Sequence, residues 1–199
     1  MKIFVSMLAT VLAAPLAAGA INVGIPAPAF QTHDAEGKPV TLAAYRGKTV
    51  VLEWTNDGCP FVGHMYSSGV MQRLQREAAT DGAVWLTVIS SAPGKQGYLT
   101  GPEVASWKAR AGAAPADVLL DPTGDLGHAY DARTTPDMYV IDRGGRLVYA
   151  GAIDDTPSTN PADARTAKNY VVGALAALKS GHPVSPAVTK PYGCSIKYR

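Results

Sequence analysis

The stretch that decides the fold is "TVVLEWTNDGCPFVGHMY", from Thr49 to Tyr66. Its first seven residues are mostly apolar and β-branched, which is typical of a buried central strand. After it, apolar side chains recur at helical spacing, at Val62, Tyr66, Val70 and Leu74. Pro60 fits the first position of that helix, where its missing N–H group costs nothing. The stretch therefore predicts a strand, a tight turn at Gly58 and a helix, with Cys59 at the junction.

The segments on both sides extend this alternation of strands and helices. We expect an N-terminal hairpin turning at Glu36-Gly37 and a second hairpin turning at Gly144-Gly145. Between and after them the patterns predict a strand at 83–91, a helix at 101–112, a short strand at 117–121 and a helix at 165–180. This order predicts an α/β fold in which a mixed central sheet is flanked by helices.

The first twenty residues have the pattern of a secretory signal peptide. One positive charge, Lys2, precedes an apolar run that ends in the small residues Ala18-Gly19-Ala20. We therefore expect a periplasmic or secreted protein with a signal peptide at 1–20, one domain at 21–181 and a proline-rich, irregular tail at 182–199 that packs on the body. No run of basic residues suggests nucleic-acid binding, and no later apolar run is long enough to span a membrane.

The chain has two cysteines, Cys59 and Cys194. In an exported protein this even number permits one internal disulfide. Cys59 sits where the N–H groups and the positive end of a helix stabilise an anion, and this position lowers the pKa of a thiol. Two interpretations stay open: Cys59 is a reactive nucleophile with Cys194 as its partner, or the two form a structural bridge that ties the tail to the body.

Three parts of the sequence together resemble the thioredoxin superfamily, in its peroxiredoxin-like (redoxin) branch of alkyl hydroperoxide reductases and thiol-specific antioxidants. They are "PAPAFQTHDAEGKPVTLAAYRGKTVVLEW", the cysteine at the strand–helix turn, and "TTPDMYVID". More narrowly, "GCPFVGHMY", "YAGAIDD" and the terminal "GCSIKY" are similar to a group of exported peroxiredoxin-like proteins. The resemblance covers nearly the whole chain after residue 20 and implies a thioredoxin-like fold.

The resemblance also implies roles for particular residues. Cys59 matches the attacking cysteine, and Thr135-Pro136 matches the threonine and cis proline that face it in thioredoxin folds. The second cysteine of the thioredoxin dithiol is absent, because Val62 holds its place. Cys194 is then the available resolving thiol.

Other positions depart from the peroxiredoxin pattern. Leu52 and Asn56 stand where that pattern has a proline and a threonine, and the peroxide-activating arginine is missing from its place near Pro136. Arg133, three residues earlier, is a candidate substitute if its loop brings it close to the thiolate. Glu53 is open to two interpretations: a buried proton-shuttling carboxyl, or a solvent-facing residue at a strand end.

These patterns predict an exported thiol oxidoreductase that reduces peroxides or exchanges disulfides through Cys59. The alternatives are a disulfide-exchange protein without peroxidase activity, and a non-catalytic module with a structural Cys59–Cys194 bridge. The sequence shows no metal, flavin or nicotinamide motif, so we expect no cofactor and a reducing partner that is a thiol protein or small thiol. His64 is expected to be a surface or packing histidine.

Overall fold

The computed structural model describes residues 22–199, so the predicted signal peptide lies outside the described residues. A seven-stranded mixed sheet forms the centre, in the order β2-β1-β5-β4-β3-β7-β8. Its strands are β1 (Gln31–Asp34), β2 (Pro39–Thr41), β3 (Val50–Trp54), β4 (Val84–Ile89), β5 (Asp117–Leu120), β7 (Asp137–Ile141) and β8 (Leu147–Gly151). Strands β3, β4 and β5 are parallel, and the other pairings are antiparallel. The predicted mixed sheet and both predicted hairpins are confirmed.

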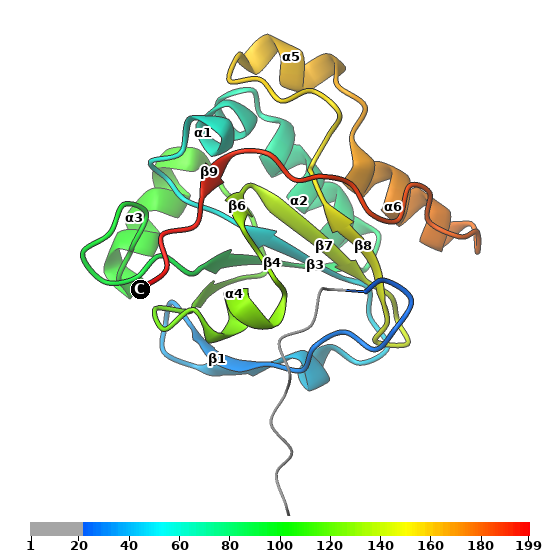
Figure 1. The fold of residues 1–199 in the computed structure, drawn as a ribbon, viewed down its shortest axis with the longest axis horizontal. Coiled ribbons are helices and arrows are strands. Elements are labelled where there is room, and N and C mark those ends of the chain that lie inside the picture. Colours follow the sequence, from blue (N-terminus) through cyan, green and yellow to red (C-terminus); the bar gives the residue numbers. More distant parts are fainter. Residues whose placement is uncertain (1–21) are drawn as a thin grey trace, which may run out of the picture.

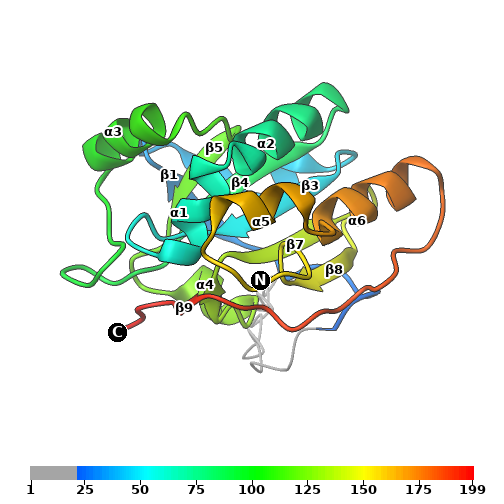
Figure 2. The same ribbon diagram turned by 90° about the horizontal axis from the view of Figure 1, so that it is seen from above.

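Helices cover both faces of the sheet (Figures 1 and 2). One face carries α1 (Pro60–Ser67), α2 (Val70–Thr80), α3 (Gly101–Ala111), α5 (Pro161–Thr166) and α6 (Tyr170–Lys179). The other face carries α4 (Asp125–Ala129) and the 3₁₀ turn η1 (Leu42–Tyr45). A buried apolar cluster lies on each side of the sheet. None of the helices in residues 22–199 is long and apolar enough to cross a membrane.

All five residues of β3 are buried, as expected of a strand with neighbours on both sides. Successive side chains point to opposite faces, so Val51 joins the cluster beneath α1 and α2, and Leu52 joins the one beneath α4. Because β3 is fixed on both edges and both faces, the turn that follows it is held in a defined place. That turn carries Cys59.

Two predicted helices are each interrupted. The apolar pattern after Pro60 continues through Leu74, but the helix breaks at Gly69, which has a φ of 81°. The predicted helix at 165–180 is wrong at its start: α5 ends at Thr166, Ala167 is extended, and α6 begins after Asn169. The Asn169 side chain accepts a hydrogen bond from Val172 N (3.0 Å) and so caps a new helix.

The C-terminal tail is irregular, as predicted, and it crosses the molecule from α6 to the carboxyl end of β3 (Figure 1, red). It first follows the edge of β8, where Ala150 exchanges backbone hydrogen bonds with Ala187 and Thr189 (3.1 Å each). It then forms β9 (Cys194–Ser195), which pairs with β6 (Thr134–Thr135) in a separate two-stranded sheet. This pairing places Cys194 opposite Thr135.

Candidate active site at Cys59

Cys59 is the N-cap residue of α1, and its exposed fraction is only 1%. Its carbonyl accepts the first bonds of the helix, from Val62 N (3.0 Å) and Gly63 N (2.8 Å). Its thiol donates to the carbonyl of Thr135 across 3.1 Å. The predicted placement at the strand–helix junction is thus present, with the sulfur turned toward the loop that precedes β7.

Thr135 brings the two cysteines together. The Thr135–Pro136 peptide bond is cis, as the resemblance implied, and the Thr135 carbonyl faces the Cys59 thiol. On the tail side, the Thr135 hydroxyl donates to the carbonyl of Cys194 (3.4 Å), next to the β6–β9 pairing. Cys59 and Cys194, which are far apart in the sequence, therefore both contact the backbone at Thr135.

The two thiols are free, and they interact with each other. Burial raises the pKa of Cys59, but hydrogen bonds from the Cys194 thiol and from the backbone N–H groups of Cys194 and Val62 outweigh it and lower the pKa below its ordinary value. Burial and the contact with Cys59 raise the pKa of Cys194 to about 11. The two pKa shifts have opposite directions, so Cys59 loses its proton more readily than Cys194 and is the better candidate for the nucleophilic thiolate.

Arg133 does not take the position that would make it a peroxide-activating residue. Its guanidinium is largely exposed and forms an ion pair with Asp131 at 2.8 Å. Its backbone carbonyl accepts a hydrogen bond from Ile196 N (3.0 Å), so it helps to hold the tail through the main chain. The loop turns the side chain toward Asp131, and the expected approach to the thiolate is not seen.

Asn56 shapes the turn before Cys59, whereas Leu52 packs in the apolar cluster on the other face of the sheet. Leu52 is fully buried in the sheet. The Asn56 side chain accepts from Gly58 N (2.9 Å) and donates to Gln96 O (3.3 Å), which fixes the turn before Cys59. Neither side chain forms a hydrogen bond with the sulfur in the described part of the chain.

Glu53 proves to be fully buried rather than solvent-facing. Its carboxylate accepts hydrogen bonds from four side chains, which are Tyr66, Gln75, Trp85 and Thr87. Burial raises its pKa to about 7, although those hydrogen bonds oppose the rise. His64 is buried as well, on α1, and neither of its ring nitrogens has a hydrogen-bond partner among the described residues.

Sequence reasoning missed Asp137, which directly follows the cis proline. It is 1% exposed, its Oδ2 accepts from Arg133 N (3.1 Å), and burial raises its pKa to about 7. It also missed Tyr192, whose hydroxyl donates to the side chain of Asp154. A single aspartate or tyrosine carries no spacing signal, and these partners meet only in the folded chain.

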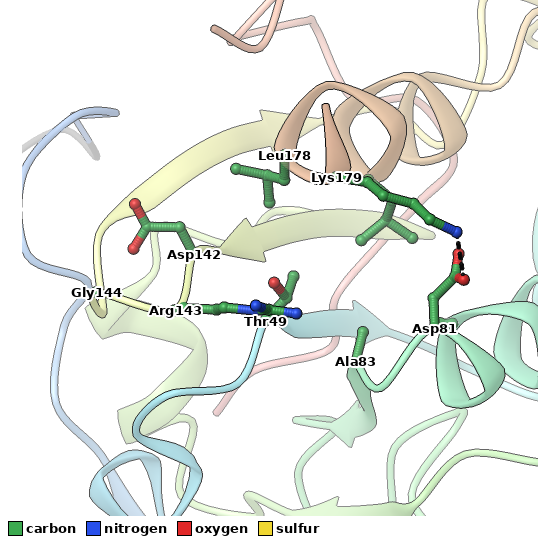
Figure 3. Close-up of a pocket in the computed structure, with 10 residues that line it drawn as sticks. Thr49, Asp81, Ala83, Asp142, Arg143, Gly144, Leu178 and Lys179 are labelled. Atoms are coloured by element: carbon green, nitrogen blue, oxygen red, sulfur yellow. Dashed lines mark hydrogen bonds and ion pairs between the residues drawn. The ribbon is translucent and has the colours of Figure 1, made fainter. Parts of the chain in front are cut away.

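Surface pockets also lie away from Cys59. One pocket of about 360 Å³ is bordered by Thr49, the β7–β8 turn and the end of α6, and contains the ion pair between Lys179 and Asp81 (Figure 3). Thr49 precedes β3 and Cys59 follows it, so this pocket is at the opposite end of the strand. Within residues 22–199 no three His, Cys, Asp or Glu side chains cluster in a way that could hold a metal ion.

Comparisons with known proteins agree with this architecture. Among solved structures, an uncharacterized conserved protein from Geobacillus kaustophilus is 27% identical (TM-score 0.77), covering 89% of this chain and 93% of that one. A hypothetical protein from Sinorhizobium meliloti is 25% identical (TM-score 0.75), covering 91% and 97%. The pneumococcal exposed lipoprotein thioredoxin from Streptococcus pneumoniae is 27% identical (TM-score 0.51), covering 76% and 98%.

No curated protein sequence matches the chain. The model of the AhpC/TSA family, however, matches residues 23–150, which is more than half of the chain and includes Cys59 and the cis proline. The match ends before the tail that supplies Cys194. With its thioredoxin-like fold and its cysteine at the start of α1, the chain belongs to the AhpC/TSA family.

Proposed function

We propose that this protein is an exported thiol oxidoreductase in which Cys59 attacks a disulfide and Cys194 resolves the product. The observation that carries the proposal is the pairing of the two thiols on Thr135, with the pKa of Cys59 lowered and that of Cys194 raised. Family membership supports thiol redox chemistry, and the pairing of the Arg133 guanidinium with Asp131 favours disulfides over peroxides as substrates.

The reaction proceeds through two exchanges. The Cys59 thiolate attacks one sulfur of a substrate disulfide, and the other sulfur leaves as a thiolate that takes up a proton. Cys194 then loses its proton and attacks the Cys59 sulfur, which releases the second substrate thiol. The substrate gains two electrons and two protons, and the protein is left with a Cys59–Cys194 disulfide. A partner thiol protein or a small thiol returns the protein to its dithiol form.

Peroxide reduction at Cys59 is the second candidate, because the chain belongs to a family of peroxide-reducing enzymes. The thiolate would attack one peroxide oxygen, forming a sulfenic acid and releasing an alcohol or water. Cys194 would then condense with the sulfenic acid, giving the same disulfide and one water. The two candidates differ only in the oxidant.

One kinetic experiment separates them. The reduced protein is mixed with hydrogen peroxide in one series and with oxidised glutathione or a disulfide-containing peptide in another, and Cys59 oxidation is followed by stopped flow. We expect Cys59 to react with the disulfide faster than a free cysteine of equal thiolate content does, and with peroxide no faster. Rapid sulfenic acid formation would favour peroxide reduction. Reaction with neither oxidant above the free-thiol rate would favour the structural bridge, as would a potential below about −300 mV.

The N-terminal sequence supports export, since it carries the charge, apolar run and small residues of a signal peptide. The similar Streptococcus pneumoniae protein is described as an exposed lipoprotein. Expression of the full chain, followed by N-terminal sequencing of the exported fraction, tests this. Cleavage near residue 20 is the expected result, and an uncleaved intracellular chain is the contrary one.

A further inference from the structure

The tail is held beside the active site by Tyr192, two residues before Cys194. The Tyr192 ring packs edge-on against Phe61, with the ring centroids 5.8 Å apart and the planes at 65°. Phe61 is two residues after Cys59, on the first turn of α1. This aromatic contact therefore joins the immediate neighbours of the two cysteines.

The Tyr192 hydroxyl reaches a different element. It donates to Oδ1 of Asp154, in the segment after β8, across 2.5 Å. Asp154 is 2% exposed, and its Oδ1 also accepts from Thr156 N (2.9 Å). A short bond to a buried carboxylate is among the stronger hydrogen bonds available to a tyrosine.

Asp154 is held in place by an isolated β-bridge to Asn169, the residue that caps α6. Its Oδ2 has no hydrogen-bond partner among the described residues, and neither has the ring of the buried His64. Burial raises the pKa of Asp154, whereas the bond from Tyr192 and the nearby His64 lower it. The helix that Cys59 caps, the Asp154 segment and the tail thus converge on the Tyr192 side chain.

Cys194 lies in β9 and is held by the β6–β9 pairing; downstream of it the tail is anchored by Ile196 N bonded to Arg133 O and by the Tyr198 hydroxyl, which donates to the Ala132 carbonyl (2.8 Å). Upstream of Cys194, the Tyr192 side chain ties the tail to Phe61 and Asp154. Tyr192 can be altered without touching the main-chain pairing.

We propose that Tyr192 is a positioning residue: through Asp154 and Phe61 it fixes the effective concentration of Cys194 at Cys59 and hence the redox potential of the pair. This rests on the proposed function, in which the two cysteines form a disulfide. Reduction of that disulfide takes two electrons and two protons from a dithiol such as dithiothreitol, which becomes cyclic and oxidised. A tail held less firmly forms the disulfide less readily, so its potential becomes less negative.

The test is the equilibrium of the protein disulfide with dithiothreitol buffers, read by mass spectrometry after thiol trapping. Tyr192→Phe keeps the ring on Phe61 and removes the hydroxyl. We expect the equilibrium constant to favour the dithiol about tenfold more than in the wild type, a potential higher by about 30 mV. A cooperative urea unfolding transition, measured on each reduced variant, shows that the variant is folded before unfolding begins.

Tyr45→Phe is the matched control. The Tyr45 hydroxyl also donates to an aspartate, Oδ2 of Asp117 at 3.1 Å, but in η1 on the opposite side of the sheet from α1. We expect this variant to keep the wild-type potential. In an Asp154→Ala background, Tyr192→Phe should cause no further change, because the hydroxyl has lost its acceptor.

These measurements test the role of Tyr192 separately from the proposed disulfide chemistry of Cys59 and Cys194. A wild type that forms no Cys59–Cys194 disulfide would remove the proposed function. A wild type that forms it, with an unchanged potential in Tyr192→Phe, would overturn only the role of Tyr192. Equal shifts in Tyr192→Phe and Tyr45→Phe would also overturn that role, because the effect would then be general.

Discussion

At the scale of single residues, the two cysteines divide their roles through one shared proton. The Thr135 carbonyl accepts from the Cys59 thiol, and Thr135 pairs with the backbone of Cys194. Burial raises the pKa of both thiols, but hydrogen bonds from Cys194 and Val62 lower that of Cys59, whereas the contact with Cys59 raises that of Cys194 further. The proton therefore stays on Cys194 until Cys59 has reacted. Cys194 thus stabilises the Cys59 thiolate first and attacks the Cys59 sulfur later. The first step, the attack of Cys59 on the substrate, then needs no further base.

The Cys194 donor can be tested with two matched substitutions. Cys194→Ser keeps a hydroxyl that can donate to the Cys59 sulfur, and Cys194→Ala removes the donor. We expect the Cys59 pKa to be higher in Cys194→Ala by about one pH unit or more, because hydrogen bonds to charged groups contribute about 1.5–3 kcal/mol. The Cys59 pKa is measured from the ultraviolet absorbance of the thiolate as a function of pH. Equal values in the two variants would show that Cys194 does not stabilise the thiolate.

A second prediction at this scale concerns Glu53, a carboxyl group whose contribution to stability should decrease as the pH rises. Its pKa in the folded protein is about 7 against an ordinary 4.5, so the folded state binds the proton more tightly than the unfolded state. Its contribution to stability is complete below pH 4.5 and is lost as the pH rises toward 7. Asp137 acts in the same direction, since its pKa is raised to about 7.

We therefore expect the free energy of unfolding to fall between pH 4.5 and 7, and Glu53→Gln to reduce that fall by about 3 kcal/mol. Urea unfolding across the range measures it. Glu103→Gln is the control: hydrogen bonds from Thr100 lower the pKa of Glu103, so its contribution is lost as the pH falls. An unaltered pH profile in Glu53→Gln would contradict the assignment.

At the scale of elements, the sequence predicted the strands more reliably than the helix boundaries. Strand β3 and the start of α1 follow from an apolar run and from Pro60, which are local signals. The break at Gly69 was not predicted, because the apolar spacing continues through it. The restart at Asn169 was missed for a similar reason: alanine is a good helix former, yet Ala167 has a ψ of 144°, outside the helical range.

Gly69 should be needed for the turn between α1 and α2. Its φ is 81°, and an added Cβ would have open space, so Gly69→Ala tests backbone strain alone. We expect a loss of stability of about 1–2 kcal/mol. Gly173, inside α6 and also without close neighbours, is the control, and Gly173→Ala should stabilise by up to about 1 kcal/mol. Similar effects of both substitutions would argue against the left-handed turn.

Gly193 should be needed for the β6–β9 pairing. A Cβ there would come within 2.1 Å of the Thr135 carbonyl oxygen, a main-chain atom that cannot move aside without disturbing the Cys59 contact. Gly193→Ala should therefore lift the tail and reduce the exchange protection of Ile196 N–H by about tenfold or more. Amide exchange followed by NMR measures this, and β3 amides serve as the internal reference. Unchanged protection at Ile196 would contradict the pairing.

At the scale of the whole molecule, the proposed active site combines residues of the body and of the tail. The sequence predicted Cys59 from a thiol at a helix start, Cys194 as the other cysteine, and Thr135-Pro136 from the resemblance to thioredoxin folds, and the structure brings these residues together. The sequence did not identify the contacts that assemble them, since Tyr192 meets Asp154 and Phe61 only after the tail has crossed β8. Arg133 shows the converse, because closeness in sequence did not bring its side chain to the thiolate.

The central claim is that Cys59 and Cys194 of one chain form a reversible disulfide. The most direct measurement is peptide mass mapping, under non-reducing conditions, of monomeric protein equilibrated in glutathione redox buffers of increasing oxidation. We expect a Cys59–Cys194 linked peptide that appears and disappears reversibly with the buffer, and none in Cys194→Ser. Two free thiols at every ratio, or a linkage found only between chains, would contradict it.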